Sequence, residues 1–125
     1  MIVVIVDDNL PHRELMRELL EIDGHVVHEA AGGTEAIALV RAENPAIVFL
    51  DLRMPVLDGF GVLDALRCDP AYSRLPVIAV SACAMQGDRE RAIQAGFDSY
   101  ITKPFDLAEL RKEVRIARAS TALVA

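Results

Sequence analysis

Five side chains that could take part in chemistry stand at the ends of stretches expected to form β-strands. They are Asp7 and Asp8 after residues 2–6, Asp51 after residues 46–50, Ser81 after residues 76–80, and Lys103 after residues 98–102. A single aspartate or serine at a strand end is more often a helix cap or a turn former than a functional group. The shared position of all five makes the set informative.

The three carboxylates indicate a bound cation. Carboxylates that lie close together repel one another, and the usual remedies are a raised pKa or a bound metal ion. Ligands that are all oxygen, without Cys or His, favour a hard ion such as Mg²⁺. Ser81 and Lys103 add donors for an anion with several oxygens, such as a phosphoryl group. Asp51 is the carboxylate best placed to attack that group.

The strand that must position Asp51 is the most apolar stretch of the chain. Ala46 to Leu50 has no polar alternation, as expected of a strand buried on both faces in a parallel sheet. The other strands are expected at residues 2–6, 26–30, 76–80 and 98–102. Helices are expected from Leu10 to about Gly24, from Gly33 to about Glu43, from Gly59 to about Cys68, from Gln86 to Ala95, and from Asp106 onward. Leu15, Leu19 and Ile22 are expected to form the buried stripe of the first helix.

Strands and helices that alternate five times predict an α/β fold. Right-handed crossovers then give a doubly wound parallel sheet of five strands, order 2-1-3-4-5, with five helices, a flavodoxin-like arrangement. Ligands in such a sheet bind at the carboxyl ends of the strands, where the five polar side chains are expected. We predict one domain over residues 1–119 and a frayed tail over residues 120–125.

Composition narrows the possible functions. The chain has 125 residues, 53% of them hydrophobic but 5% aromatic, which predicts a core of Val, Ile, Leu and Ala. A net charge of -6 argues against direct binding of nucleic acid or of an anionic membrane. The apolar opening from Met1 to Val6 is too short for a signal peptide or a membrane span, so a cytoplasmic location is expected.

In order and spacing, these residues resemble the receiver domain of bacterial two-component response regulators. The matching motifs are Val6-Asp7-Asp8-Asn9, Asp51 with Met54-Pro55 and Asp58-Gly59, Ser81-Ala82, and Lys103-Pro104-Phe105. The segment from Ala84 to Arg89 is similar to stand-alone regulators and to receivers attached to hybrid kinases.

The resemblance implies a role for each site residue. Asp51 would be the phosphoacceptor, and Asp8, Asp51 and the backbone carbonyl of Arg53 would ligate Mg²⁺, with Asp7 acting through a bound water. Lys103 would pair with the phosphoryl oxygens. Ser81 would move to bond one of those oxygens, and Tyr100 would then turn inward as an aromatic switch. The matching Lys-Pro peptide bond is often cis in this family, and Lys103-Pro104 would reproduce that feature.

The same resemblance implies partners. A sensor histidine kinase or a histidine phosphotransfer protein would supply the phosphoryl group. A surface of the fourth helix, fifth strand and fifth helix would then be presented to a downstream protein target. The chain would act as a signalling domain and not as an enzyme, either as a monomer or as a phosphorylation-dependent dimer.

Two alternatives come from other classes of protein. A haloacid dehalogenase-like hydrolase also attacks phosphate from a strand-end aspartate, but it needs a second aspartate where this chain has Arg53. A flavin or nucleotide binding module cradles phosphate with Gly, Ser or Thr after the first strand, where Asp7 and Asp8 would repel it. The Arg53 side chain itself would either contact the phosphate or be solvated.

Overall fold

Five parallel strands form one sheet at the centre of the molecule. The computed structural model describes residues 1–82 and 87–124, with side chains up to residue 119. The strands are β1 (Ile2–Val6), β2 (Val26–Ala30), β3 (Ile47–Asp51), β4 (Val77–Ser81) and β5 (Ser99–Thr102). Their order is β2-β1-β3-β4-β5, and every neighbouring pair is parallel. The predicted fold class and strand order are confirmed.

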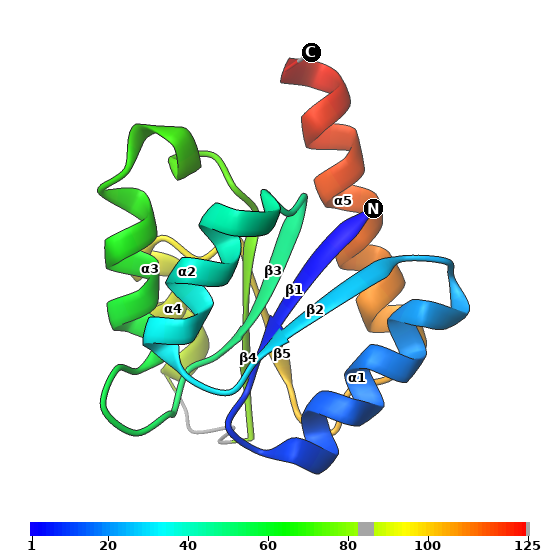
Figure 1. The fold of residues 1–125 in the computed structure, drawn as a ribbon, viewed down its shortest axis with the longest axis horizontal. Coiled ribbons are helices and arrows are strands. Elements are labelled where there is room, and N and C mark those ends of the chain that lie inside the picture. Colours follow the sequence, from blue (N-terminus) through cyan, green and yellow to red (C-terminus); the bar gives the residue numbers. More distant parts are fainter. Residues whose placement is uncertain (83–86, 125) are drawn as a thin grey trace.

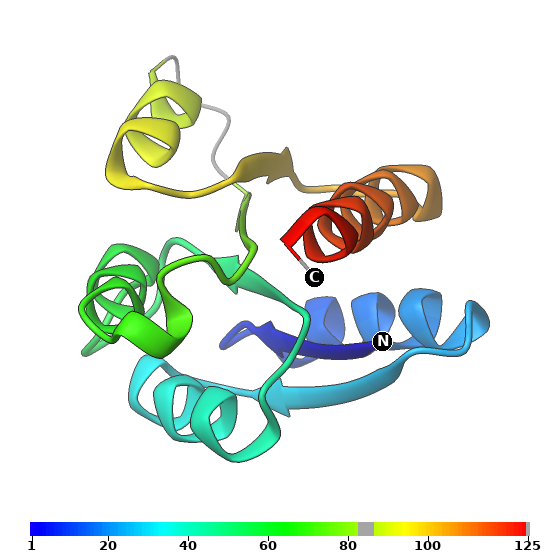
Figure 2. The same ribbon diagram turned by 90° about the horizontal axis from the view of Figure 1, so that it is seen from above.

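Helices cover both faces of this sheet (Figures 1 and 2). They are α1 (Leu10–Ile22), α2 (Gly33–Glu43), α3 (Gly59–Arg67), α4 (Asp88–Ala95) and α5 (Leu107–Val124), with a short 3-10 helix at Pro70–Tyr72. Helices α1 and α5 lie on one side of the sheet, and α2, α3 and α4 lie on the other. Right-handed crossovers of parallel strands produce this two-sided arrangement.

The central strand β3 sends alternate side chains into two cores. Val48 and Leu50 pack in the cluster on the α2–α3–α4 side, and Ile47 and Phe49 pack in the cluster on the α1–α5 side. All five residues of β3 are buried, including the terminal Asp51. Because side chains alternate along a strand, an unbroken apolar run serves a strand that is covered on both faces.

The buried stripe of α1 differs from the prediction. Met16 and Leu20 are the buried residues of this helix, whereas Leu15 and Ile22 are 45% and 66% exposed. Both sets have helical spacing, so periodicity alone does not choose between them. Contact with the core cluster on the α1–α5 side selects Met16 and Leu20, and Leu19 lies at its margin.

The ends of the last two helices differ from the ends predicted from the sequence. Helix α4 begins at Asp88, and the predicted start at Gln86 falls in the segment outside the described residues. Ala92 is its one buried apolar side chain. Helix α5 is capped by Asp106, whose Oδ1 accepts from the Glu109 backbone N–H at 2.9 Å. It continues to Val124, beyond the domain boundary predicted at residue 119, and that boundary stays a prediction.

Within the described part of the chain, none of the helices combines the length and the apolar character needed to cross a lipid bilayer.

Candidate acidic site at the carboxyl edge of the sheet

Parallel pairing brings the predicted carboxylates together. Strands β1 and β3 are neighbours with Val6 opposite Leu50, so Asp7 and Asp51 leave the sheet at the same edge. One oxygen from each of Asp7, Asp8 and Asp51 lies within 4.8 Å of the others. Asp7 and Asp51 are buried, at 6% and 7% exposed, while Asp8 is open to solvent. The structure therefore assembles the acidic cluster that the strand ends predict.

Lys103 reaches this cluster from the end of β5, the edge strand next to β4. Its Nζ donates to Asp7 Oδ2 at 2.7 Å and lies 3.7 Å from Asp51 Oδ2. Its backbone N–H donates to the carbonyl of Ser81 at 2.8 Å, which fixes the end of β5 beside the end of β4. The following peptide bond to Pro104 is cis, as the resemblance implies. The lysine side chain is 8% exposed, so its charge interacts with the carboxylates in partial isolation from water.

Burial and like charge act together on Asp51. They raise the pKa of its carboxyl to about 6, with burial as the larger cause and the negative charge of Asp7 as the next. The Lys103 ammonium and the Arg53 backbone N–H, 3.3 Å from Asp51 Oδ1, act in the opposite direction. The cluster is thus short of positive charge even with Lys103 in place.

The donor set fits a hard divalent cation. All three cluster side chains offer carboxylate oxygens, and the carbonyl of Arg53 lies in the backbone two residues after Asp51. Oxygen ligands without sulfur or imidazole are the preference of Mg²⁺. A cation at this place also relieves the repulsion that raises the pKa of Asp51.

The hydroxyl and the aromatic residue occupy the predicted strands. Ser81 is the last residue of β4, is 1% exposed and pairs in register with Thr102 of β5. Tyr100 lies in β5, is partly buried, and packs against the core cluster on the α2–α3–α4 side. Ser81 therefore lies at the carboxyl end of β4, and Tyr100 lies two residues before the carboxyl end of β5.

Sequence reasoning missed the contribution of α1. His12 accepts a hydrogen bond from Lys103 Nζ at its Nδ1, 3.0 Å away, and Arg13 Nη1 donates to the Asp7 carbonyl at 2.8 Å. Asn9 places this first turn, because its Oδ1 accepts from the His12 N–H at 3.0 Å. The available signal was the Asn9 cap two residues after Asp7, which directs the helix start over the site.

A close backbone approach on the other side of the site requires glycine. A Cβ on Gly59 would lie 2.5 Å from the Asp51 carbonyl oxygen and 2.8 Å from Leu52 Cα. The preceding Asp58 caps α3 through its Oδ1, which accepts from the Gly61 N–H at 2.9 Å. The Asp58-Gly59 pair thus starts a helix directly against the strand that ends in Asp51.

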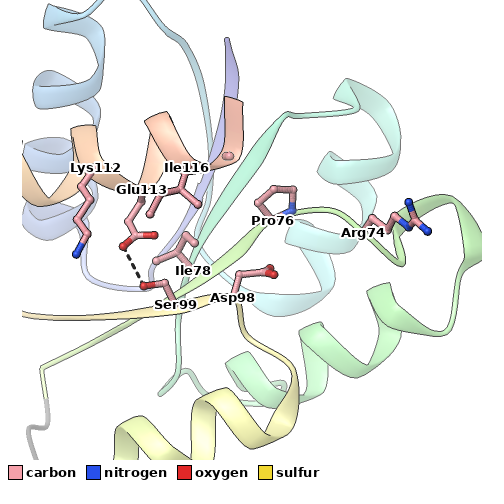
Figure 3. A pocket seen from close by; sticks show the side chains of 9 residues that line it. Arg74, Pro76, Ile78, Asp98, Ser99, Lys112, Glu113 and Ile116 are labelled. Carbon is pink, nitrogen blue, oxygen red and sulfur yellow. Dashed lines mark hydrogen bonds between the residues drawn. The ribbon is translucent and has the colours of Figure 1, made fainter. Parts of the chain in front are cut away.

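A separate cavity of about 190 Å³ lies away from this site, between β4, β5 and α5 (Figure 3). Its wall includes Asp98, just before β5, and Ser99, the first residue of β5, whereas Lys103 follows the end of that strand. The Ser99 hydroxyl donates to Glu113 Oε1 at 2.9 Å across the cavity wall. This cavity lies at the amino-terminal ends of the strands and is separate from the acidic site.

The doubly wound sheet and the acidic cluster define a phosphoaccepting signalling domain. The chain belongs to the response regulator receiver domain family, whose sequence pattern it matches over residues 3–115. This membership favours two-component signal transduction over a haloacid dehalogenase-like hydrolase or a flavin module. Members of the family bind Mg²⁺ at the acidic site.

Individual relatives agree with this assignment. The chain is 38% identical to a 14.6 kDa protein of Leptolyngbya boryana over 113 residues, which cover 90% of this chain and 86% of that protein. It is 35% identical to the polar-differentiation response regulator DivK of Brucella ovis, over 90% of this chain and 92% of the relative.

The solved structure of one related domain contains a metal ion. The receiver domain of a sensor histidine kinase from Pseudomonas aeruginosa PAO1 is 34% identical, with a TM-score of 0.82 and 94% of each chain covered. That structure has a magnesium ion coordinated in its active site cleft.

Proposed function

We propose that the chain accepts a phosphoryl group on Asp51 from a phosphohistidine of a sensor histidine kinase or a histidine phosphotransfer protein. The reaction is magnesium-dependent, and its product switches a surface that binds a downstream protein. One observation carries the proposal, namely the convergence of Asp7, Asp8, Asp51 and Lys103 at one edge of the sheet.

The Asp51 carboxylate is the nucleophile. Its Oδ1 is held by the Arg53 N–H, so Oδ2 is the oxygen that attacks phosphorus. The new O–P bond forms as the P–N bond of the phosphohistidine breaks, and the bonding electron pair stays on the imidazole nitrogen. The site needs Asp51 ionised, which the raised pKa opposes until a cation is present.

The cation and Lys103 stabilise the transferred charge. Asp8, Asp51 and the Arg53 carbonyl would hold Mg²⁺, with Asp7 acting through water, and the bound cation would supply positive charge beside the phosphoryl oxygens. Lys103 exchanges its bond to Asp7 Oδ2, 2.7 Å from its Nζ, for one to a phosphoryl oxygen on Asp51, whose Oδ2 lies 3.7 Å from the same Nζ.

The response passes through Ser81 and Tyr100. A phosphoryl group adds a dianion with three strong acceptors next to the end of β4. The Ser81 hydroxyl bonds one of these oxygens, and Tyr100 turns inward toward the space that Ser81 leaves. The surface of α4, β5 and α5 then differs between the two states, which is the signal a partner reads.

The proposal includes a protein partner and a cellular setting. The chain works in the cytoplasm as a receiver domain of residues 1–119, without enzymatic activity toward other molecules and without direct contact to nucleic acid or membrane. It is a monomer or a dimer that forms on phosphorylation. The acidic balance of the chain, with a net charge of -6, supports a protein partner over a nucleic acid.

Intact-mass measurement with acetyl phosphate tests the proposal. Wild type should gain one acid-stable, base-labile phosphoryl group in Mg²⁺ and lose that gain in EDTA, whereas Asp51→Asn should gain none. Asp64→Asn, an exposed aspartate of α3, is the matched control and should label like wild type. Equal labelling of wild type and Asp51→Asn would refute the assignment. A phosphatase assay and an absorbance scan separate the hydrolase and flavin alternatives.

A further inference from the structure

Asp88 is a buried carboxylate with incomplete pairing. It opens α4, is 9% exposed, and its Oδ2 has no hydrogen-bond partner among the described residues. The cation beside it is Arg53, whose Nη2 lies 3.9 Å from that oxygen, too far for a hydrogen bond. A buried carboxylate in this state depends strongly on a nearby positive charge.

Arg53 also adjoins the phosphoacceptor. Its backbone N–H donates to Asp51 Oδ1 at 3.3 Å, and its side chain is 62% exposed. A cavity of about 120 Å³ lined by Leu52, Arg53, Asp58, Phe60, Asp88 and Arg91 separates the start of α4 from the loop after β3. The guanidinium therefore has room to turn without displacing packed side chains.

Arg91, the other arginine of this cavity, is already engaged. Its guanidinium carbon lies 5.3 Å from the centre of the Phe60 ring, in a cation–π contact. The Phe60 ring in turn packs edge-on against Phe97, with 5.7 Å between ring centres. Arg53 is thus the arginine of this cavity that is available to both Asp51 and Asp88.

We infer that the Arg53 guanidinium is shared between Asp88 in the resting protein and the phosphoryl group on Asp51 in the modified protein. The inference rests on the proposed function and adds to it a link from Asp51 to α4. A phosphoryl dianion offers two oxygens to the planar guanidinium and competes well against one distant carboxylate. Asp88 then loses its counter-ion while still buried.

The first turn of α4 relieves this loss by exposing Asp88 to water. Few contacts oppose such a movement, because Ala92 is the one buried apolar side chain of the helix. The residue before the helix, Gly87, has no side chain with which to cap it. Arg53 and Asp88 therefore couple the state of Asp51 to the position of α4.

Linkage makes the inference measurable. If Asp88 competes for Arg53, then removing the charge of Asp88 must favour the phosphoryl-bound form. The gain in affinity equals the affinity that this competition takes away in wild type. We expect Asp88→Asn to bind beryllofluoride, in Mg²⁺, about fivefold more tightly than wild type. Arg53→Ala should bind it more weakly, and Asp88→Asn should have no effect in the Arg53→Ala background.

Glu90→Gln is the matched control. It removes the same charge from the first turn of α4, but from an exposed side chain, so its effect measures the helix dipole alone. Beryllofluoride affinity in Glu90→Gln should equal that of wild type. As a second readout, amide shifts of residues 88–92 in unmodified Asp88→Asn should move part of the way toward their beryllofluoride-bound positions.

The double-mutant cycle of Asp88→Asn and Arg53→Ala separates two kinds of failure. If wild type binds beryllofluoride and Asp51→Asn does not, but Asp88→Asn acts equally with and without Arg53, the proposed function stands and the shared guanidinium is wrong. An Asp88→Asn affinity equal to wild type also overturns the inference. If wild type itself binds no beryllofluoride, both the proposed function and this inference fall.

Discussion

Lys103 Nζ donates to Asp7 Oδ2 at 2.7 Å, between residues that are 96 positions apart in the chain. In the structure the ammonium therefore neutralises a carboxylate of the cluster, and it lies 1 Å farther from Asp51 Oδ2, at 3.7 Å against 2.7 Å. In the proposed site, Lys103 and Mg²⁺ therefore compete for the same negative charge. This competition gives the first prediction.

Lys103→Met should bind Mg²⁺ more tightly than wild type, by about three- to tenfold, because a positive charge beside the metal site is removed. Isothermal titration calorimetry measures the dissociation constant. Lys112→Met, on an exposed position of α5, removes the same charge far from the cluster and should leave the constant unchanged. A weaker or equal affinity in Lys103→Met would contradict the competition.

Magnesium affinity should fall as the pH is lowered through about 6. Asp51 must lose its proton to act as a ligand, and burial together with the charge of Asp7 raises its pKa to about 6. One unit below that value, proton competition lowers the affinity about tenfold. Titrations at about pH 7.5 and about pH 5 check this. An affinity that stays constant over this range would mean that Asp51 keeps an ordinary pKa.

Asp51→Asn should stabilise the metal-free protein at neutral pH. The folded state holds the Asp51 proton more firmly than the unfolded state, because the pKa is raised from 3.8 to about 6. The stability that this proton provides is complete below the unfolded value and is lost as the pH rises through about 6. Asparagine cannot ionise, so it avoids that loss.

Thermal unfolding in EDTA measures the effect. At neutral pH the midpoint of Asp51→Asn should exceed that of wild type by a few degrees, and the two should converge near pH 4. Asp64→Asn, on the exposed side of α3, should follow wild type throughout. A lower midpoint for Asp51→Asn at neutral pH would show that the ionised carboxylate stabilises the fold.

Gly59→Ala should lower the free energy of unfolding by about 1–3 kcal/mol. The added Cβ meets backbone, the Asp51 carbonyl oxygen at 2.5 Å and Leu52 Cα at 2.8 Å, so neither neighbour can rotate away. In Gly61→Ala the new Cβ meets the end of the Leu57 side chain, which can rotate, and this variant is the control. Urea unfolding of both variants tests the difference, and equal losses would contradict it.

Ser81→Ala should leave phosphorylation of Asp51 largely intact and blunt the structural response. In the proposed mechanism the hydroxyl is not needed for attack on phosphorus, but it links the phosphoryl group to β4 and β5. Amide chemical shifts around Tyr100, with and without beryllofluoride, provide the readout. Shifts that change as fully in Ser81→Ala as in wild type would count against the role of Ser81.

The sheet and the acidic cluster were predictable for the same physical reason. An apolar run such as residues 47–50 fits a strand covered on both faces, and parallel pairing places the residues that follow such strands at one edge. Asp7, Asp51 and Lys103 could therefore be grouped before any coordinates were known.

Orientation within helices was less predictable. The sequence offers Leu15, Leu19 and Ile22 as one stripe of α1 and Met16 with Leu20 as another, and contacts with distant segments decide between them. The same holds for His12, whose bond to Lys103 depends on how α1 turns over the site. The burial of Asp88 depends likewise on how α4 packs, which its polar sequence does not reveal.

The bond between Asp7 and Lys103 has a consequence during protein synthesis. Lys103 is synthesised 96 residues after Asp7, so a nascent chain that extends past Asp51 but not to Lys103 carries the acidic residues without their lysine. Such a chain lacks the ammonium that the proposed phosphoacceptor site requires. Unfinished copies should therefore not divert phosphate from finished receivers.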